Sequence, residues 1–130
     1  MAQRVLLVED NLDLVSLLKL AFARADFDLA VALNGNEALQ KTRELQPDLV
    51  LMDLMLPDMD GIEVCRRLRA HPDLIGVRVV MLSACCGIQA RRAAREVGVL
   101  DYWTKPFSPS ELLTKIQCVL KPNDQTSATA

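Results

Sequence analysis

Polar side chains that could bind and transfer a phosphoryl group follow several short apolar runs of this sequence. Glu9 and Asp10 come directly after RVLLV, Asp53 ends DLVLMD, Ser83 ends VRVVMLS, and Lys105 stands two residues after VLDYW. If these runs are parallel strands of one sheet, their carboxyl ends lie along one edge, where ligands of such sheets bind. We therefore expect the five side chains to lie near one another.

Three carboxylates gathered at one place raise one another's proton affinity unless a cation lies among them. The candidate ligands are all hard oxygen donors, which suits Mg²⁺ better than Zn²⁺. A serine hydroxyl and a lysine charge are what the oxygens of a phosphoryl group on one carboxylate would need. Taken singly, each residue could be an ordinary capping or surface residue, but their common edge favours phosphoryl transfer at a Mg²⁺ site.

The apolar runs that position these residues are predicted to be strands. They occupy residues 4–8, 28–32, 48–53, 77–83 and 99–103. The first, third and fourth are almost unbroken in their apolarity, which is typical of parallel strands covered on both faces. The segments between them carry apolar residues at helical spacing, and they are predicted to be the crossover helices.

Each predicted helix has a start signal, a stop signal or an apolar stripe. The first begins after Asn11 or Asp13, the second is capped by Asn36, the third begins near Gly61, the fourth runs from about 88 to 97 before Gly98, and the fifth is capped by Ser108 or Ser110. The expected stripe of the first helix is Leu14, Leu17, Leu18, Ala21 and Phe22, and that of the fifth is Leu112, Leu113, Ile116, Val119 and Leu120.

The alternation of strands and helices predicts the fold class. It is α/β, a (βα)5 doubly wound five-stranded parallel sheet with the flavodoxin-like order 2-1-3-4-5. The 130 residues suit one domain, which we expect to span residues 1–121. After Pro122 the chain has no apolar residue larger than alanine, so residues 122–130 are predicted to be a disordered tail or the start of a linker.

Composition excludes several classes of protein. A formal net charge of −2 gives no global attraction to nucleic acid, so we expect no direct nucleic-acid binding by this chain. The apolar run at 5–8 is too short for a signal peptide or a membrane span, which predicts a cytoplasmic protein that does not bind membranes. The cysteines form no C-x-x-C pair and His71 is the single histidine, so no zinc site is predicted.

Four motifs stand in order along the chain: VLLVEDN at 5–11, DLVLMDLMLPDMDG at 48–61, VVMLSA at 79–84 and DYWTKPFSPSELL at 101–113. Together they resemble the receiver domain of bacterial two-component response regulators, and the resemblance extends from residue 4 to about 121. It implies that Asp53 is the phosphoacceptor and Asp10 a direct Mg²⁺ ligand. It also implies that Glu9 binds the metal through water and that the backbone carbonyl of Met55 is a further ligand.

The same resemblance implies how the phosphorylated state is bound, read out and lost. Ser83 would hydrogen-bond the phosphoryl group and Lys105 would pair with it. Movement of Ser83 would open space into which Tyr102 turns, as a two-state switch. Met55 and Cys85 stand where they can influence the water that hydrolyses the acyl phosphate, and their poor hydrogen-bonding capacity predicts slow hydrolysis.

The implied function is that of a phosphorelay signalling protein, not an enzyme, that catalyses its own phosphorylation and dephosphorylation. The expected donor is a phosphohistidine on a sensor histidine kinase or a histidine phosphotransfer protein. A downstream effector would meet the face formed by the fourth helix, the fifth strand and the fifth helix, where the fourth helix carries Arg91, Arg92 and Arg95.

Two alternatives stay open. The chain could be the N-terminal receiver of a DNA-binding transcriptional regulator, with residues 122–130 as the start of its linker. It could instead be a small flavin or nucleotide binder on the same fold. The acidic, glycine-free turn EDNLD after the first strand argues against the second alternative, because it would repel a phosphate.

Overall fold

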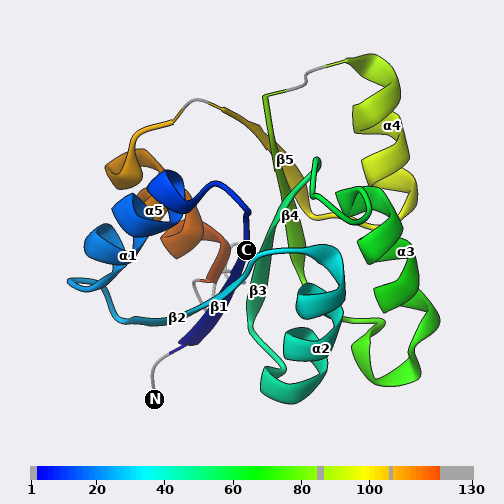
Figure 1. Ribbon diagram of the computed structural model, residues 1–130, viewed down its shortest axis with the longest axis horizontal. Coiled ribbons are helices and arrows are strands. Elements are labelled where there is room, and N and C mark those ends of the chain that lie inside the picture. The colour runs from blue at the N-terminus through cyan, green and yellow to red at the C-terminus, as the bar shows by residue number, and fades with distance from the viewer. Residues whose placement is uncertain (1–2, 85–86, 106, 121–130) are drawn as a thin grey trace, which may run out of the picture.

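The computed structural model describes residues 3–84, 87–105 and 107–120, and within them it is a parallel sheet between two layers of helices (Figure 1). The strands pair in the order β2-β1-β3-β4-β5, all parallel, which confirms the predicted doubly wound fold. The elements in chain order are β1 Gln3–Val8, α1 Leu12–Phe22, β2 Phe27–Ala32, α2 Gly35–Leu45, β3 Leu49–Asp53, α3 Gly61–Ala70, a 3-10 turn Pro72–Leu74, β4 Val79–Ser83, α4 Ile88–Glu96, β5 Asp101–Thr104 and α5 Pro109–Leu120.

The core has two apolar layers, one on each face of the sheet. Val5 and Leu7 of β1 pack on the side of α1 and α5, whereas Leu6 and Val8 pack on the side of α2, α3 and α4. Every residue of β3 and β4 is buried. This two-sided burial explains the unbroken apolar runs and fixes the strand that ends at Asp53.

Side-chain caps set where the helices begin. The Asn11 carboxamide oxygen accepts hydrogen bonds from the backbone N–H groups of Asp13 (3.0 Å) and Leu14 (3.2 Å), so Asn11 caps α1. Ser108 caps α5 in a reciprocal arrangement: its Oγ accepts from the Glu111 N–H, and its own N–H donates to the Glu111 carboxylate. Two start signals were predicted for α1 and two for α5, and the structure uses Asn11 for α1 and Ser108 for α5.

The predicted cap of α2 was wrong. Asn34, not Asn36, caps this helix, because the Asn34 carboxamide oxygen accepts from the Glu37 N–H at 2.8 Å. Asn36 lies inside the first turn of the helix. The chain leaves β2 at Ala32, so the backbone is still extended at Asn34 and can place a capping side chain there.

Two other expectations differ in detail. In α1 the buried stripe is Val15, Leu18 and Phe22, whereas Leu17, predicted to be buried, is 49% exposed. The helix is so rich in leucine that more than one apolar stripe could be drawn on it.

β4 and β5 each begin two residues later than predicted. The Val77 N–H closes a turn onto the Leu74 carbonyl, and the Val99 N–H still bonds the end of α4.

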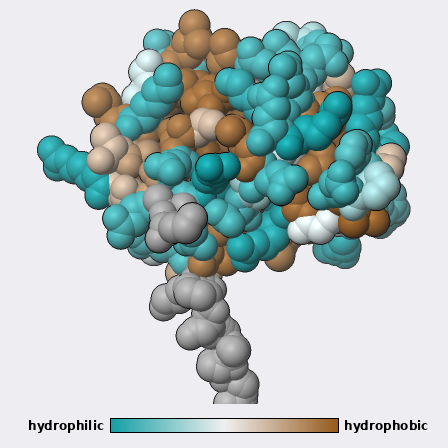
Figure 2. Space-filling view, turned by 90° about the horizontal axis from the view of Figure 1, so that it is seen from below, coloured by the Kyte–Doolittle hydropathy of each residue, from teal (hydrophilic) through white to brown (hydrophobic). Residues whose placement is uncertain are grey.

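The surface in Figure 2 is a mosaic of hydrophilic residues with small hydrophobic patches between them. Among the described residues, no helix has the length and apolarity needed to cross a membrane. The predicted tail, 122–130, and Cys85 lie outside the described residues.

Candidate functional site

Three carboxylates meet at the carboxyl ends of β1 and β3. Glu9 and Asp10 follow β1 and Asp53 ends β3, and one carboxylate oxygen from each lies within 4.8 Å of those of the other two. Glu9 is 1% exposed and Asp53 is 7% exposed, whereas Asp10 is open to solvent. The structure thus brings together the three acids that the strand ends predicted to be neighbours.

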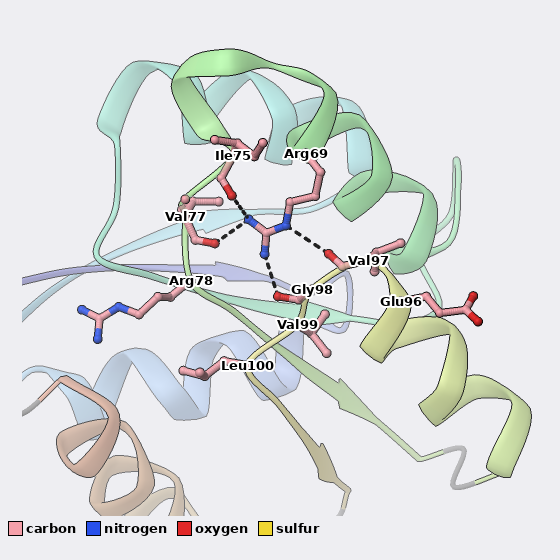
Figure 3. Close-up of a pocket in the computed structure, with 10 residues that line it drawn as sticks. Arg69, Ile75, Val77, Arg78, Glu96, Val97, Gly98, Val99 and Leu100 are labelled. Atoms are coloured by element: carbon pink, nitrogen blue, oxygen red, sulfur yellow. Dashed lines mark hydrogen bonds between the residues drawn. The ribbon is translucent and has the colours of Figure 1, made fainter.

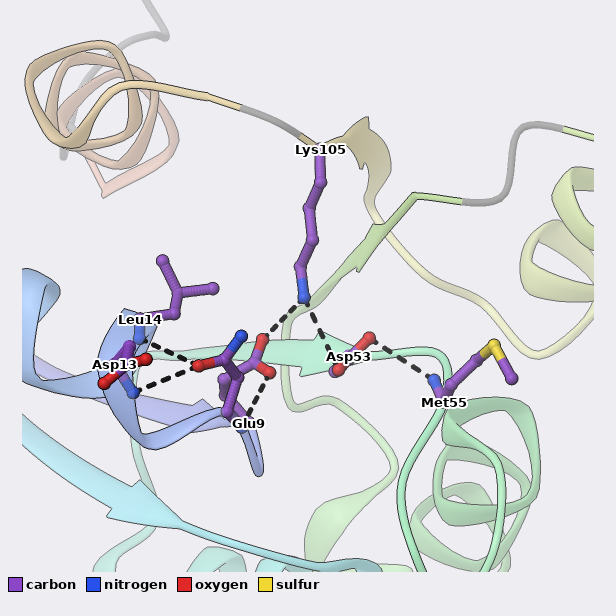
Figure 4. A network of polar contacts seen from close by, with 7 residues as sticks. Glu9, Asp13, Leu14, Asp53, Met55 and Lys105 are labelled. Atoms are coloured by element: carbon purple, nitrogen blue, oxygen red, sulfur yellow. Dashed lines mark hydrogen bonds and ion pairs between the residues drawn. The ribbon is translucent and has the colours of Figure 1, made fainter.

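Lys105 reaches into this acidic cluster from the end of β5 (Figure 4). Its Nζ lies 2.7 Å from Glu9 Oε1 and 3.5 Å from Asp53 Oδ2, and its side chain is 22% exposed. The second Glu9 oxygen accepts a hydrogen bond from the Asn11 N–H at 3.1 Å. The buried Glu9 carboxylate is therefore compensated by a lysine charge and a backbone donor, and the same lysine spans both acids.

The charge of Asp53 is less well compensated than that of Glu9, because its contacts with Lys105 and with a backbone N–H are both longer. Burial, followed by the negative charge of Glu9, raises its pKa to about 6, although Lys105 and the Met55 N–H act in the opposite direction. The Met55 N–H lies 3.3 Å from Asp53 Oδ1, which is a long hydrogen bond. The excess of negative charge and the purely oxygen donor set fit a small hard cation such as Mg²⁺.

Close packing of α3 against the end of β3 also defines the site. The Gly61 N–H donates to the Leu54 carbonyl at 2.7 Å, and the Leu54 N–H donates to the Leu82 carbonyl at 3.1 Å. A Cβ atom at Gly61 would lie 2.5 Å from the Asp53 carbonyl oxygen, so only glycine fits without displacing the backbone. The sequence prediction took Gly61 only as the approximate start of a helix and missed this role.

Ser83 and Tyr102 lie on the strands beside this cluster. Ser83 is buried at the end of β4, and its carbonyl accepts a hydrogen bond from the Lys105 N–H at 2.9 Å. Tyr102 is half-buried on β5, and the Arg91 guanidinium of α4 lies 4.8 Å from the centre of its ring. The predicted switch residues are thus on adjacent paired strands, and one of them contacts α4.

A hollow of about 560 Å³ lies at the opposite edge of the sheet, before β4 and β5 (Figure 3). The charged group at its centre, the Arg69 guanidinium, already forms hydrogen bonds within the protein. It donates to the backbone carbonyls of Ile75, Val77, Val97 and Gly98 at 2.7 to 3.0 Å. Arg69 therefore joins the end of α4 to the turn before β4. This hollow has no part in the carboxylate site.

Comparison with known proteins agrees with the fold. The model of the response regulator receiver domain family matches residues 5–117. The DNA-binding response regulator MtrA of Mycobacterium tuberculosis is 44% identical over 128 residues, which are 98% of this chain and 55% of MtrA. The alkaline phosphatase synthesis transcriptional regulatory protein PhoP of Bacillus subtilis is 36% identical over 95% of this chain and 51% of PhoP. The chain spans about half the length of these curated relatives.

Solved structures of response regulators have the same fold. The chemotaxis response regulator CheY4 of Vibrio cholerae superposes with a TM-score of 0.85 at 26% identity, covering 92% of this chain and all of that one. The phosphorylated cyanobacterial phytochrome response regulator RcpA superposes with a TM-score of 0.79 at 28% identity, covering 92% of this chain and 91% of that one. The chain belongs to the response regulator receiver domain family, whose members are signalling proteins of two-component systems.

Proposed function

We propose that this chain accepts a phosphoryl group on Asp53. The observation that carries the proposal is the placement of one nearly buried aspartate at a strand end, with a lysine and two further acids around it. The Asp53 carboxylate attacks phosphorus, the bond from phosphorus to the donor histidine nitrogen breaks, and an acyl phosphate forms on Asp53. The phosphorylated state of the similar RcpA supports this chemistry.

The same proposal assigns the metal ligands. Asp10, Asp53 and the Met55 carbonyl would hold Mg²⁺ directly, and Glu9 would hold it through water. When bound, the ion neutralises oxygens of the transferring phosphoryl group. The chain's own residues supply the positioning: β3 fixes Asp53, and Lys105 lies where its charge can pair with phosphoryl oxygens.

Ser83 and Tyr102 would carry the signal away from the site. Ser83 would donate its hydroxyl to the phosphoryl group, and Tyr102 would then turn into the space that Ser83 leaves. The Arg91 contact with the Tyr102 ring supports this proposal, because it connects the switch to the surface of α4. The downstream effector would dock on the face of α4, β5 and α5, where a hollow of about 260 Å³ is lined by Arg91, Arg95 and Tyr102 among others.

Phosphorylation from a small donor tests the function directly. The purified chain is incubated with Mg²⁺ and a small acyl phosphate, and its intact mass and peptide masses are measured. We expect the mass of one phosphoryl group to be added, to depend on Mg²⁺ and to map to the peptide that contains Asp53. No incorporation, or incorporation into another peptide, would contradict the proposal.

A transcriptional output is the second candidate. It is favoured by the relatives MtrA and PhoP, which are described as a DNA-binding response regulator and a transcriptional regulatory protein. In either case the phosphoryl donor would be a phosphohistidine on a sensor kinase or a phosphotransfer protein.

The cytoplasmic location and the lack of direct nucleic-acid binding by this chain remain predictions from the sequence.

Asp10→Ala is expected to abolish measurable Mg²⁺ binding. Mg²⁺ loses water reluctantly and uses few protein ligands, so we expect wild-type binding to be weak, on the order of millimolar, and to depend on each carboxylate. Calorimetric titration of the two proteins measures the difference. Asp13→Ala is the matched control, because this exposed acid lies only three residues away and is not one of the clustered acids. An Asp10→Ala variant that binds Mg²⁺ like the wild type would place the ion elsewhere.

Replacing Met55 by Asn and Cys85 by Glu is expected to shorten the lifetime of the phosphorylated form. Met55 is 72% exposed and its side chain extends away from Asp53 in Figure 4, so it offers no strong hydrogen-bond partner to a water near the carboxylate. Polar side chains there can orient an attacking water, which corresponds to about a tenfold faster hydrolysis. Phosphate release is followed over time, with Met55→Leu and Cys85→Ala together as the apolar control. Equal decay of all three proteins would contradict the prediction.

A further inference from the structure

We propose that Asp58 is a positioning residue for the Mg²⁺ site: it ties the loop that carries Met55 to the first turn of α2. This inference rests on the proposed function, because the Met55 carbonyl matters only if the loop contributes a metal ligand. It concerns a residue outside the carboxylate cluster and a part of the fold, the start of α2, that does not contain a site residue.

The Asp58 carboxylate makes two hydrogen bonds across the structure. Its Oδ1 accepts from the Gly35 N–H at 2.7 Å, and its Oδ2 accepts from the Asn36 N–H at 2.9 Å. Both donors belong to the first turn of α2 and have no partner within the helix, because an α-helix leaves its first N–H groups unpaired. One carboxylate from the loop after β3 thus completes the N-terminus of another helix.

The cap residue of α2 leaves these two donors available. The Asn34 side chain accepts from the N–H of Glu37, one turn further along, and the Glu37 carboxylate reaches back to the Leu33 N–H at 2.7 Å. Asp58 supplies acceptors for the two N–H groups that this local cap leaves unpaired. The two helix N–H groups also hold the pKa of Asp58 below its ordinary value, because they stabilise the ionised carboxylate.

Backbone contacts close the loop between the site and Asp58. Met55 and Asp60 form an antiparallel bridge across it, and the Gly61 N–H closes its base on the Leu54 carbonyl. Asp60 accepts from the Glu63 N–H at 2.8 Å and so starts α3. Asp58 stands at the tip of this closed loop, so a tether there restrains Met55 at its other end.

Side-chain packing supports the same attachment. A Cβ atom at Gly35 would lie 2.5 Å from Met59 Cγ and 3.1 Å from Val64 Cγ2. The loop and the start of α3 therefore press directly on the first residue of α2. This contact is independent of the Asp58 hydrogen bonds, and it shows that the loop tip and α2 are packed as one unit.

The test combines two measurements on the full chain with three substitutions. Hydrogen exchange of the Met55 and Gly61 amides is measured without Mg²⁺, and Mg²⁺ affinity is measured by calorimetry. Asp58→Ala removes both hydrogen bonds, and Asp58→Asn keeps one acceptor oxygen. Asp48→Ala is the matched control, because Asp48 accepts from a backbone N–H in the same way, that of Arg4 at 2.7 Å, at the opposite end of the sheet.

In Asp58→Ala we expect the Met55 and Gly61 amides to exchange about fivefold faster, because the loop opens more often. We expect Mg²⁺ to bind about tenfold more weakly, as when a residue that orients a metal ligand is lost. Asp58→Asn should be intermediate in both measurements, and Asp48→Ala should match the wild type in both.

Three results would overturn the inference: wild-type behaviour of Asp58→Ala, faster exchange with unchanged Mg²⁺ affinity, or faster exchange spread evenly over the whole chain. A wild-type protein that binds no Mg²⁺ would instead contradict the metal ligands assigned under the proposed function. In that case faster exchange of Met55 and Gly61 would still identify the tether, and unchanged exchange would refute it.

Discussion

Asp53→Asn is expected to abolish phosphoryl incorporation from an acyl-phosphate donor while leaving the fold intact. The amide has nearly the shape of the carboxylate but lacks the anionic oxygen that attacks phosphorus. Asp53 is 7% exposed at the end of a fully buried strand, so the substitution keeps the side chain in place and changes only its chemistry. Intact-mass measurement after incubation with Mg²⁺ and the donor gives the result, and we expect no phosphorylated species above background.

Asp28→Asn is the control for this substitution. It makes the same chemical change at an exposed aspartate of β2, in the strand at the edge of the sheet. We expect it to be phosphorylated as fast as the wild type. If Asp53→Asn were phosphorylated as fully as Asp28→Asn, the acceptor would be a different residue and the mechanism would have to be reassigned.

The sequence was sufficient to predict the fold and the neighbourhood of the acids. Unbroken apolar runs can be recognised without tertiary information, and the residue that ends such a run lies at the end of its strand. Once the runs are assigned to a parallel sheet, Glu9, Asp10 and Asp53 must lie at one edge. Their proximity is thus a consequence of topology and not of any contact between their side chains.

Contacts between segments were less predictable. Lys105 was expected to pair with a phosphoryl group, but in this structure its shortest contact is the 2.7 Å ion pair with Glu9. That pairing depends on how far each side chain extends from its strand end. The Asp58 tether joins residues 22 and 23 positions apart, and each partner taken alone resembles an ordinary turn or helix start.

Local ambiguity accounts for the remaining errors. Asn34 and Asn36 flank Gly35, and either could cap a helix until the end of β2 is known. In α1, Val15 is buried and Leu17 is exposed, although leucine is as apolar as valine. The direction in which a helix faces the sheet is decided by the connections at its ends, which hydrophobic periodicity alone does not describe.

In the absence of metal, Asp53→Asn is also expected to stabilise the protein at neutral and alkaline pH. The pKa of Asp53 is about 6 in the folded chain against an ordinary value of 3.8. The folded state therefore binds more protons than the unfolded state between these two values, and the free energy of unfolding falls as the pH rises through this range. The folded and ordinary pKa values differ by about two units. Above pH 6 this difference lowers the free energy of unfolding by at most about 3 kcal/mol, relative to acid conditions.

Asparagine carries no charge at any of these pH values, so the variant avoids this loss. Urea denaturation of both proteins is measured with a metal chelator from about pH 4 to pH 8, and the difference in unfolding free energy is taken at each pH. Other titrating groups are common to both proteins and largely cancel in that difference.

We expect the variant to be more stable at pH 8, with an advantage that shrinks towards zero as the pH falls through 6 to 4. A difference independent of pH, or a more stable wild type at pH 8, would show that the Asp53 carboxylate is not held against charge repulsion and burial. Adding Mg²⁺ should narrow the gap at pH 8, because a cation among the acids stabilises the ionised wild-type carboxylate and has less to bind in the variant.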